Sequence, residues 1–364
     1  MLKAYAIEDL KPGMVVGRDV MDHNGEPLIN VGAVLTNEMI FDLLDRPIFS
    51  IYIDEDADDM AAISIPARDH LLDDSYVTEY AGLYDQVVVL FEQLRAGAPL
   101  DVQAVTAAME PLQHKGLCKG VKAVSQIHNM KRSGDYLVHH CLHVAILAGL
   151  MGNREKWPKD KIYDIMLAGL LIDCGKTRIA PEILNKQGKL TDEEFAEIRQ
   201  HPVYGYELIK ESSLGSKRDI LMGVLQHHER SDGSGYPYGS VQDEISVMGR
   251  ILGILDIYDA MAADKSYAKR KSPFDIFAII YDDILAGKLD PTYGVKFIRH
   301  LCQDLNGNWV ALSNGEKGRI VYIDPSRVSS MPIVQTAHGK FVDLNTVRDV
   351  RIEAILTADE AMED

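Results

Sequence analysis

The sequence predicts a mainly α-helical protein, in which a helical bundle is flanked by a small N-terminal α/β module and a small β-rich C-terminal module. Between residues 72 and about 290, apolar side chains recur at the three- and four-residue spacing of helices. After residue 306, three turn sequences that contain glycine separate short runs rich in β-branched residues, which is typical of strands. Long helical patterns with few strand signals between them favour a bundle.

These patterns divide the chain of 364 residues, which is long enough for two or three cores, into four segments. We expect an α/β module over 1–62, a linker and helical lead-in over 63–135, a helical domain over 136–292 and a β-rich module over 293–364. Helical spacing is clearest at Tyr84, Val87, Val88, Phe91 and Leu94, and again at Leu137, His140, Val144 and Leu147. The tail turns are 306–308, 314–316 and 338–340, and 319–323 is an expected strand.

The N-terminal segment is expected to begin with a hairpin. Val15-Val16 and Pro27 to Ile29 flank Asn24-Gly25, a strong turn signal. Thr36 opens a short helical run over 39–44, and residues 48–53 are expected to form a closing strand. The segment carries no convergent cluster of acids, bases or ligands. The acidic run that follows, 54–59, is expected to be a solvated surface rather than a calcium site.

Composition excludes several classes of partner and of location. A net charge of −17 argues against a nucleic-acid polymer, because phosphate contacts need clustered Lys and Arg. The four cysteines (Cys118, Cys141, Cys174 and Cys302) form no CxxC pair, which favours a reducing compartment. No signal peptide is recognisable, and no apolar run approaches the roughly 20 residues that span a bilayer. We therefore predict a cytoplasmic protein without a membrane partner.

The most informative stretch is 227–237, HHERSDGSGYP. Two adjacent histidines, His227 and His228, end a helical run. Neighbouring side chains on a helix point about 100° apart, so both imidazoles reach one metal only if that helix end faces a pocket. Gly233, Gly235 and Pro237 then impose an irregular loop beside them.

Further candidate ligands lie in four other segments of the chain. They are His140, Asp173, His201 and Asp256. Asp173 and Asp256 each lie in an apolar, helix-like stretch, where an unpaired carboxylate costs several kcal/mol (order of magnitude). Either aspartate alone would more often cap or hydrogen-bond a neighbouring helix. Together with the histidines, however, the pattern favours a metal site of the mixed His/Asp type that suits iron, manganese or zinc.

The string at 227–237 resembles the HHExxxGxGYP signature of the HD-GYP family, bacterial phosphodiesterases that act on cyclic di-GMP. Residues 136–270 follow the family's order of segments, including Asp-x-Gly-Lys at 173–176. The resemblance implies a centre of two divalent ions, iron or manganese. It implies that Asp173 bridges them and that Lys176 holds a substrate phosphate, which makes these two the catalytic candidates. The implied ligands are His140, Asp173, His201, His227, His228 and Asp256.

One departure from the family pattern concerns a ligand. Ile172 stands where the family has the histidine of its HD pair, and isoleucine has no lone pair to donate. One ion would then keep His140, Asp256 and the bridging Asp173. His143, one turn from His140, would be a substitute ligand if it rotated, but we favour a packing role for it. Tyr136 occupies the place of a glutamate that binds a third ion in some members. We expect one strong and one weakened metal position.

The candidates for substrate binding are Lys176, Arg230, Tyr236, Lys265 and Lys269. The alternatives are a solvated lysine at 176, loop anchoring by Arg230 and loop shaping by Tyr236. Residues 264–269 resemble the family segment Asp-Arg-Pro-Tyr-Arg/Lys that contacts cyclic di-GMP, with Lys265 and Ala268 as departures. Cys174 is expected to be a buried thiol rather than a nucleophile.

Metal-dependent hydrolysis of cyclic di-GMP is the leading functional hypothesis. The main rival is a degenerate domain that binds cyclic di-GMP without cutting it, which the changes at Ile172, Lys265 and Ala268 favour. A third reading is a phosphohydrolase for another nucleotide. The N-terminal segment resembles the small module found ahead of many HD-GYP domains, which implies docking or regulation. Two further hypotheses concern partners. The chain would form a homodimer, and a GGDEF-type or other signalling protein would bind the loop that contains Gly235-Tyr236-Pro237, which we call the GYP loop.

Overall fold

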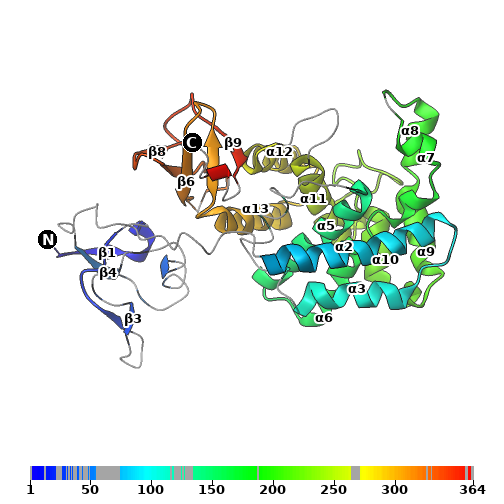
Figure 1. Ribbon diagram of the computed structural model, residues 1–364, viewed down its shortest axis with the longest axis horizontal. Helices are drawn as coiled ribbons and strands as arrows, with labels where there is room; N and C mark the ends of the chain where they lie inside the picture. The colour runs from blue at the N-terminus through cyan, green and yellow to red at the C-terminus, as the bar shows by residue number, and fades with distance from the viewer. Residues whose placement is uncertain are drawn as a thin grey trace.

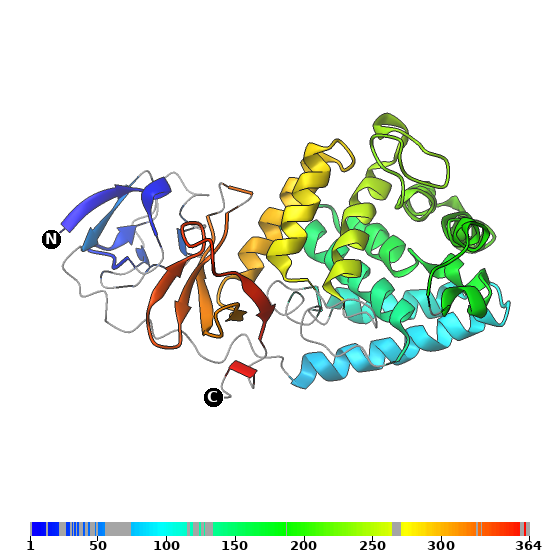
Figure 2. The same cartoon turned by 90° about the horizontal axis from the view of Figure 1, so that it is seen from above.

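The computed structural model places three bodies along the long axis of the molecule (Figures 1 and 2). The N-terminal module lies at one end, the helices fill the other, and the C-terminal sheet lies between them. The structure describes residues 2–11, 14–21, 27–29, 31, 33, 35, 39, 40, 43, 48, 50–54, 74–114, 117, 118, 124, 127, 134–186, 188–263, 271–324, 327, 328, 330–356, 360 and 361.

The N-terminal module has two small antiparallel sheets and its own apolar core. Strand β1 (Leu2–Ala6) pairs with β4 (Ser50–Asp54), and β2 (Val20–Met21) pairs with β3 (Pro27–Ile29). The expected first hairpin strand at Val15-Val16 is therefore wrong. Val16 is fully buried and forms a bridge to Ile53 of β4 instead. Burial of its side chain against β4 is therefore favoured over pairing in the hairpin. The turn at 24–25 and the start of the helical run at 36 lie outside the described residues.

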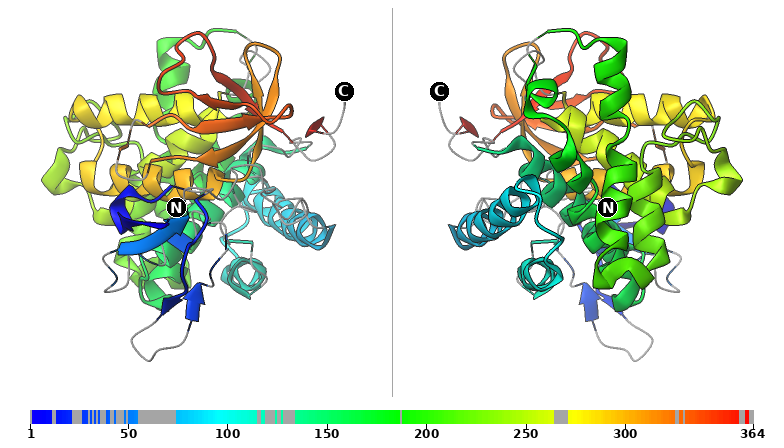
Figure 3. Two further views of the ribbon diagram at one scale, coloured as in Figure 1. Left: turned by 90° about the vertical axis from the view of Figure 1, so that its left-hand side faces the viewer. Right: turned by 90° about the vertical axis from the view of Figure 1, so that its right-hand side faces the viewer.

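The helical part confirms the predicted fold class. Its helices are α2 (Asp74–Arg95), α3 (Val102–His114), α5 (Tyr136–Arg154), α6 (Lys159–Leu170), α7 (Pro181–Leu184), α8 (Asp192–Ile198), α9 (His201–Lys210), α10 (Arg218–Gln226), α11 (Val247–Ala262), α12 (Pro273–Leu285) and α13 (Pro291–Leu305). Short 3-10 turns lie at η1 (Ile7–Asp9), η2 (Cys174–Arg178), η3 (Ser213–Ser216) and η4 (Gln242–Glu244). Helices α2 and α3 pack on each other along the outside of the bundle (Figure 3).

Helix α5 is the central helix of the bundle. Every residue from Val138 to Gly152 is buried, as expected of a helix that is apolar on all sides. It packs against α6 and α11, and a Cβ at Gly169 of α6 would approach the backbone of Ala145 to 3.0 Å. Asp135 caps the helix by accepting a hydrogen bond from the amide of Leu137. The histidines of α5 are therefore held in the interior.

The C-terminal module is a five-stranded antiparallel sheet in the order β8-β7-β6-β5-β9. Its strands are β5 (Trp309–Leu312), β6 (Lys317–Tyr322), β7 (Ile333–Thr336), β8 (Phe341–Asp343) and β9 (Ile352–Ile355). Gly307, Gly315 and Gly339 adopt φ values of 86°, 84° and 81°, which explains the glycines of the three predicted turns. The apolar core of this sheet is continuous with that of the helices. The sequence-based boundary at 293 falls within α13.

The cysteines and the apolar helices can be compared with the sequence-based expectations. All four cysteines are free and buried. None of the helices in the described ranges combines the length and apolar character that a bilayer crossing requires.

Candidate metal centre

Five separate parts of the helical domain bring the candidate ligands together in the interior. His140 lies on α5, Asp256 on α11 and His201 at the first position of α9. His227 caps the C-terminus of α10, and His228 follows it. These residues are buried except His228, whose side chain is 15% exposed.

Asp173 lies in the turn between α6 and η2, not inside a helix as the apolar pattern suggested. The helix ends at Leu170, and Asp173 occupies the position before η2. The carboxylate remains 1% exposed, so the turn delivers it into the core without a helical backbone.

Asp173, His201, His227 and His228 form what we call the four-residue cluster. One ligand atom from each lies within 4.8 Å of all the others. Asp173 Oδ1 lies 3.1 Å from His201 Nε2 and 3.8 Å from His227 Nε2. The two Nε2 atoms are 3.3 Å apart.

Hydrogen bonds on the outer side of the cluster orient two of its imidazoles. His201 Nδ1 lies 2.7 Å from the carbonyl oxygen of Ile198, and His227 Nδ1 lies 2.7 Å from that of Val224. A carbonyl can only accept, so each Nδ1 carries the proton in the neutral ring. Each Nε2 then presents a lone pair to the cluster, the arrangement that outer-shell partners give to metal-binding histidines.

The donor set of the four-residue cluster fits a bound cation. Asp173 Oδ1 is buried and accepts no well-formed hydrogen bond within the described part of the chain. The lone pairs of His201 Nε2 and His227 Nε2 point at the same space. Buried acceptors facing one another without a donor are costly, and a divalent ion removes that cost. Two to three imidazoles with a carboxylate suit iron, manganese or zinc.

The second half of the site is what we call the His140–Asp256 pair. His140 Nε2 lies 3.1 Å from Asp256 Oδ1 and 3.5 Å from Asp173 Oδ2. Asp256 Oδ2 lies 3.6 Å from His228 Nδ1. The two oxygens of Asp173 therefore face different halves, which is the geometry that a bridging carboxylate requires.

Asp259 borders the candidate centre and was not predicted from the sequence. It is fully buried, and its Oδ2 accepts a hydrogen bond from His140 Nδ1 at 2.8 Å. Its Oδ1 accepts one from His143 Nδ1 at 2.9 Å. This carboxylate turns His140 Nε2 toward the centre, while His143 also packs against Tyr80 with ring centroids 5.7 Å apart. A second buried aspartate three residues after Asp256 on the same apolar helix was the available signal.

The two halves differ in protonation before any ion binds. Burial alone would lower the pKa of His140, but hydrogen bonds to Asp256 and Asp259 outweigh it and raise the pKa to about 9. Burial and the adjacent His201 instead lower the pKa of His227 to about 4. His140 is therefore an imidazolium at neutral pH, whereas His227 is neutral and ready to coordinate.

The other ligands of the centre have shifted pKa values as well. Burial, followed by the influence of His227, lowers the pKa of His228 well below its ordinary value. Burial opposes ionisation of Asp173, but the charge of Lys176 holds the pKa of its carboxyl well below the usual range. Asp256 is likewise lowered, since burial is outweighed by the nearby His228 and His140. Both carboxyls are ionised at neutral pH.

Two neighbours of Asp173 in the sequence differ in what they offer the centre. Lys176 contacts the Asp173 carboxylate, whereas Ile172 has no lone pair with which to bind an ion. Lys176 Nζ donates to Asp173 Oδ2 at 2.5 Å, and its side chain is 26% exposed. Burial would lower the pKa of Lys176, but Asp173 raises it, so the ammonium stays charged. Ile172 is fully buried in the apolar core. Burial raises the pKa of Cys174 to about 12, which keeps it a thiol.

The GYP loop is held rigidly beside the centre. Glu229 is buried, and its carboxylate accepts hydrogen bonds from the amides of Tyr238 (2.8 Å) and Ser240 (3.0 Å). Arg230 Nη1 donates to the carbonyls of His227 and Glu229 at 3.3 and 2.9 Å, the contacts expected of a loop anchor. A Cβ at Gly235 would lie 2.4 Å from a backbone nitrogen, so the packing requires glycine there.

Tyr236 links this loop to the four-residue cluster. Its ring stacks on that of His228, with centroids 4.5 Å apart and planes 28° apart. Burial raises the pKa of Tyr236, so the hydroxyl is un-ionised. Lys265 and Lys269 lie outside the described residues.

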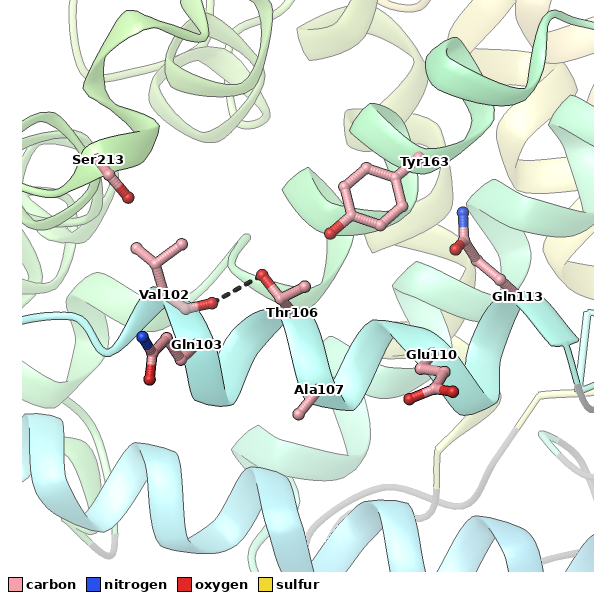
Figure 4. Close-up of a pocket in the computed structure, with 8 residues that line it drawn as sticks. All are labelled: Val102, Gln103, Thr106, Ala107, Glu110, Gln113, Tyr163 and Ser213. Atoms are coloured by element: carbon pink, nitrogen blue, oxygen red, sulfur yellow. Dashed lines mark hydrogen bonds between the residues drawn. The ribbon is translucent and has the colours of Figure 1, made fainter.

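A cavity of about 630 Å³ lies along α3, away from the candidate ligands (Figure 4). Its lining includes Val102, Glu110 and Tyr163 but none of the ligands. Thr106, also in the lining, donates its hydroxyl to the carbonyl of Val102 at 2.8 Å. The cavity is therefore a surface feature separate from the metal centre.

The helical domain that holds this site is similar to known proteins. Residues 121–293 match the family model described as HD domain. A cyclic di-GMP phosphodiesterase of Pseudomonas aeruginosa is 33% identical over 183 residues, 50% of this chain and 44% of the relative. The cyclic di-GMP phosphodiesterase response regulator RpfG of Xanthomonas campestris is 36% identical over 138 residues, 37% of this chain and 36% of the relative.

The chain thus covers less than half of the length of each of these two relatives. Among solved structures, Bd1817, an HDG"Y"P protein from Bdellovibrio bacteriovorus, aligns over 82% of this chain and 98% of that one. The identity is 15% and the TM-score 0.48.

Proposed function

We propose that this protein is a metal-dependent phosphodiesterase that hydrolyses cyclic di-GMP. The observation that carries the proposal is the convergence of Asp173 Oδ1, His201 Nε2 and His227 Nε2 on one buried space without a donor among them. The similarity to phosphodiesterases named for cyclic di-GMP supports the choice of substrate.

We further propose which residues hold the ions. Asp173, His201, His227 and His228 would hold one, and His140 with Asp256 would hold a second through the bridging Asp173. Bound divalent ions would lower the pKa of a coordinated water and offset negative charge on a phosphoryl group. Iron and manganese are the expected metals, since both accept mixed imidazole and carboxylate ligands.

The remaining roles belong to side chains that surround the ligands. Lys176 supplies a positive charge beside Asp173, where it would hold a non-bridging phosphate oxygen. Tyr236 covers one face of His228 and limits how a substrate approaches the cluster. We propose that Arg230 acts mainly through the loop that it anchors, and that Lys265 and Lys269 contact substrate from the segment after α11.

Hydrolysis of cyclic di-GMP, measured by chromatography with iron or manganese added, tests the proposal. The natural protein is expected to convert cyclic di-GMP to a linear product, and His228→Ala to lose that activity together with bound metal. His338→Ala, an exposed histidine in the tail, is the matched control and should retain both. Activity that persists in His228→Ala would contradict the proposed centre.

The second candidate is a protein that binds cyclic di-GMP without cutting it. Ile172 favours this reading, because a buried side chain without a lone pair replaces an expected ligand. Tight binding of cyclic di-GMP by calorimetry, with no turnover at any metal concentration, would support it and overturn the enzyme. Turnover of a different cyclic dinucleotide, but not of cyclic di-GMP, would support a phosphohydrolase for another nucleotide.

Two further experiments test the proposed partners. Light scattering measures the molar mass and tests the homodimer. Loss of a bound signalling protein in a pull-down when the exposed Tyr238 is altered tests a partner at the GYP loop.

A further inference from the structure

A row of four flat side-chain groups leads from the surface to the four-residue cluster. His228 stacks on Tyr236 at 4.5 Å between ring centroids. The guanidinium carbon of Arg199 lies 4.9 Å from the centroid of Tyr236 on the row's outer side. The same guanidinium lies 5.9 Å from the ring of Phe195. We call these residues the stacked row.

Local structure explains how the outer half of the row is built. Phe195 lies on α8 and Arg199 is the C-cap of that helix, so the two are four residues apart on one face. With α7, this helix projects from the bundle (Figure 1). Phe195 is 51% exposed, so the row is open to solvent at its outer end.

The positive charge of Arg199 is not neutralised by an ion pair. Among the residues that the structure describes, no carboxylate lies within ion-pair distance of it, whereas Arg178 pairs with Glu207 at 3.4 Å. The acids nearest in sequence have other partners. Glu194 binds Lys186, and Glu197 accepts a hydrogen bond from the hydroxyl of Tyr204. An uncompensated guanidinium in a chain of net charge −17 is available for an anionic ligand.

A single exposed phenylalanine is ordinary at a protein surface and would carry nothing by itself. What distinguishes Phe195 is its position in line with Arg199 and Tyr236, next to candidate metal ligands. Successive aromatic and guanidinium planes are the surfaces on which nucleobases stack. The stacked row joins His228 of the cluster to the exposed Phe195, so it would lie beside the part of a cyclic dinucleotide that extends from the cluster toward solvent.

Resting on the proposed function, we propose that Phe195 and Arg199 form an outer subsite for the nucleobase remote from the scissile phosphate. The base stacks on the planes of Phe195 and Arg199, and the guanidinium also faces the second phosphate. The subsite recognises a dinucleotide over a simple phosphodiester, because only the dinucleotide has a second base to place there. Arg199 and Phe195 are specificity residues and do not touch the reacting phosphate.

The test compares two substrates with Phe195→Ala and Arg199→Ala. For cyclic di-GMP, loss of one stacking surface is expected to raise KM about 10-fold, with kcat within about twofold. Methyl p-nitrophenyl phosphate, which has no nucleobase, should be hydrolysed with unchanged kcat/KM. Arg199→Lys keeps the charge but not the plane, so it should not restore KM.

Two matched variants control for general effects of these changes. Arg18→Ala removes a guanidinium that lies 4.3 Å from the ring of Tyr52 in the N-terminal module. Phe341→Ala removes a phenylalanine that is 53% exposed on β8. Both should leave KM for cyclic di-GMP unchanged, and melting temperatures report whether each variant folds.

The outcomes separate this inference from the proposed function. Turnover of cyclic di-GMP with unchanged KM in Phe195→Ala and Arg199→Ala overturns the subsite alone, as does full rescue by Arg199→Lys. If the natural protein binds cyclic di-GMP without turnover, the enzyme proposal fails, and a roughly 10-fold weaker Kd in the two variants still supports the subsite. Neither binding nor turnover in the natural protein overturns both.

Discussion

The two halves of the candidate centre use the same residue types but differ in how ready they are for a metal ion. In the four-residue cluster, backbone carbonyls of Ile198 and Val224 fix the imidazoles, and His227 is neutral at pH 7. In the His140–Asp256 pair, a carboxylate fixes the imidazole, and His140 holds a proton with a pKa of about 9.

The difference shows that the hydrogen-bond partner on the outer side of a histidine decides whether its ring is neutral and can bind a metal ion. A carbonyl oxygen orients the ring without adding net charge, whereas Asp259 and Asp256 stabilise the imidazolium. A divalent ion must displace that proton at His140 but not at His227. Because Ile172 also offers no lone pair, we expect the His140–Asp256 pair to be the weaker half.

Asp173→Asn is expected to have the largest effect, because it alters the carboxylate whose two oxygens face the two halves. An amide carries no charge and bridges two cations poorly, so both ions should be lost and turnover should fall by about 10³-fold or more. This exceeds the roughly 10–100-fold that changes to outer-shell partners cost. Metal content by mass spectrometry, beside hydrolysis rates, checks it. Retention of one ion would show that the four-residue cluster does not depend on the bridge.

Ile172→His should strengthen the weaker half selectively. A restored imidazole ligand is expected to raise the affinity for the second ion by about 10–100-fold. It should raise turnover at low metal while leaving the first ion's affinity unchanged. Titration with manganese, followed by electron paramagnetic resonance and activity, measures both affinities.

Ile172→Val is the matched control, since it keeps an apolar side chain in the core. An unchanged second affinity in a folded Ile172→His variant would show that residue 172 does not reach the site. The asymmetry between the halves would then rest on His140 alone.

The candidate ligands could be selected from the sequence because several are polar residues in apolar surroundings. His140 and Asp256 lie on helices buried nearly all round, where only a partner or an ion makes such side chains tolerable. The helical fold was predictable because apolar residues recur at helical spacing wherever one face of a helix is buried. The tail turns were predictable because glycines at 307, 315 and 339 have positive φ.

Features that depend on contacts distant in the chain were not predictable. Asp259 serves His140 across 119 positions of sequence, and no local pattern states that pairing. The apolar neighbours of Asp173 favour a helix by their pattern, but in the structure they are buried in a turn between α6 and η2. Strand β1 escaped notice because its pairing with β4 joins residues about 50 apart. The stacked row likewise joins α8 to the GYP loop only in three dimensions.

Asp259→Asn should weaken the His140–Asp256 pair without affecting the four-residue cluster. The amide can keep the shape of the carboxylate but supports only one of the two hydrogen bonds from His140 and His143 as an acceptor. We expect about a 10-fold loss of affinity for the second ion and little change for the first. Calorimetric titration with manganese resolves the two steps. Equal losses at both steps would indicate a general effect on the core.

Asp243→Asn provides the control, since this acid belongs to the exposed turn η4. Its two manganese affinities should equal those of the natural protein.

The affinity for the second ion should depend on pH, whereas the affinity for the first should not, because only His140 must lose a proton. The pKa of His140 is raised from 6.5 to about 9 in the metal-free folded protein. Its contribution to stability is therefore complete below pH 6.5 and is lost as the pH rises through about 9. Binding of the second ion must release that proton, so its affinity should rise on the order of tenfold per pH unit between pH 6.5 and 8.5. The first ion meets His227, whose pKa of about 4 leaves no proton to release in this range.

Calorimetry in buffers of different ionisation enthalpy counts the protons released at each step. One proton at the second step and none at the first is the expected result. Equal release at both steps would remove the protonation difference between the halves, and the weaker half would then owe its weakness to Ile172 alone.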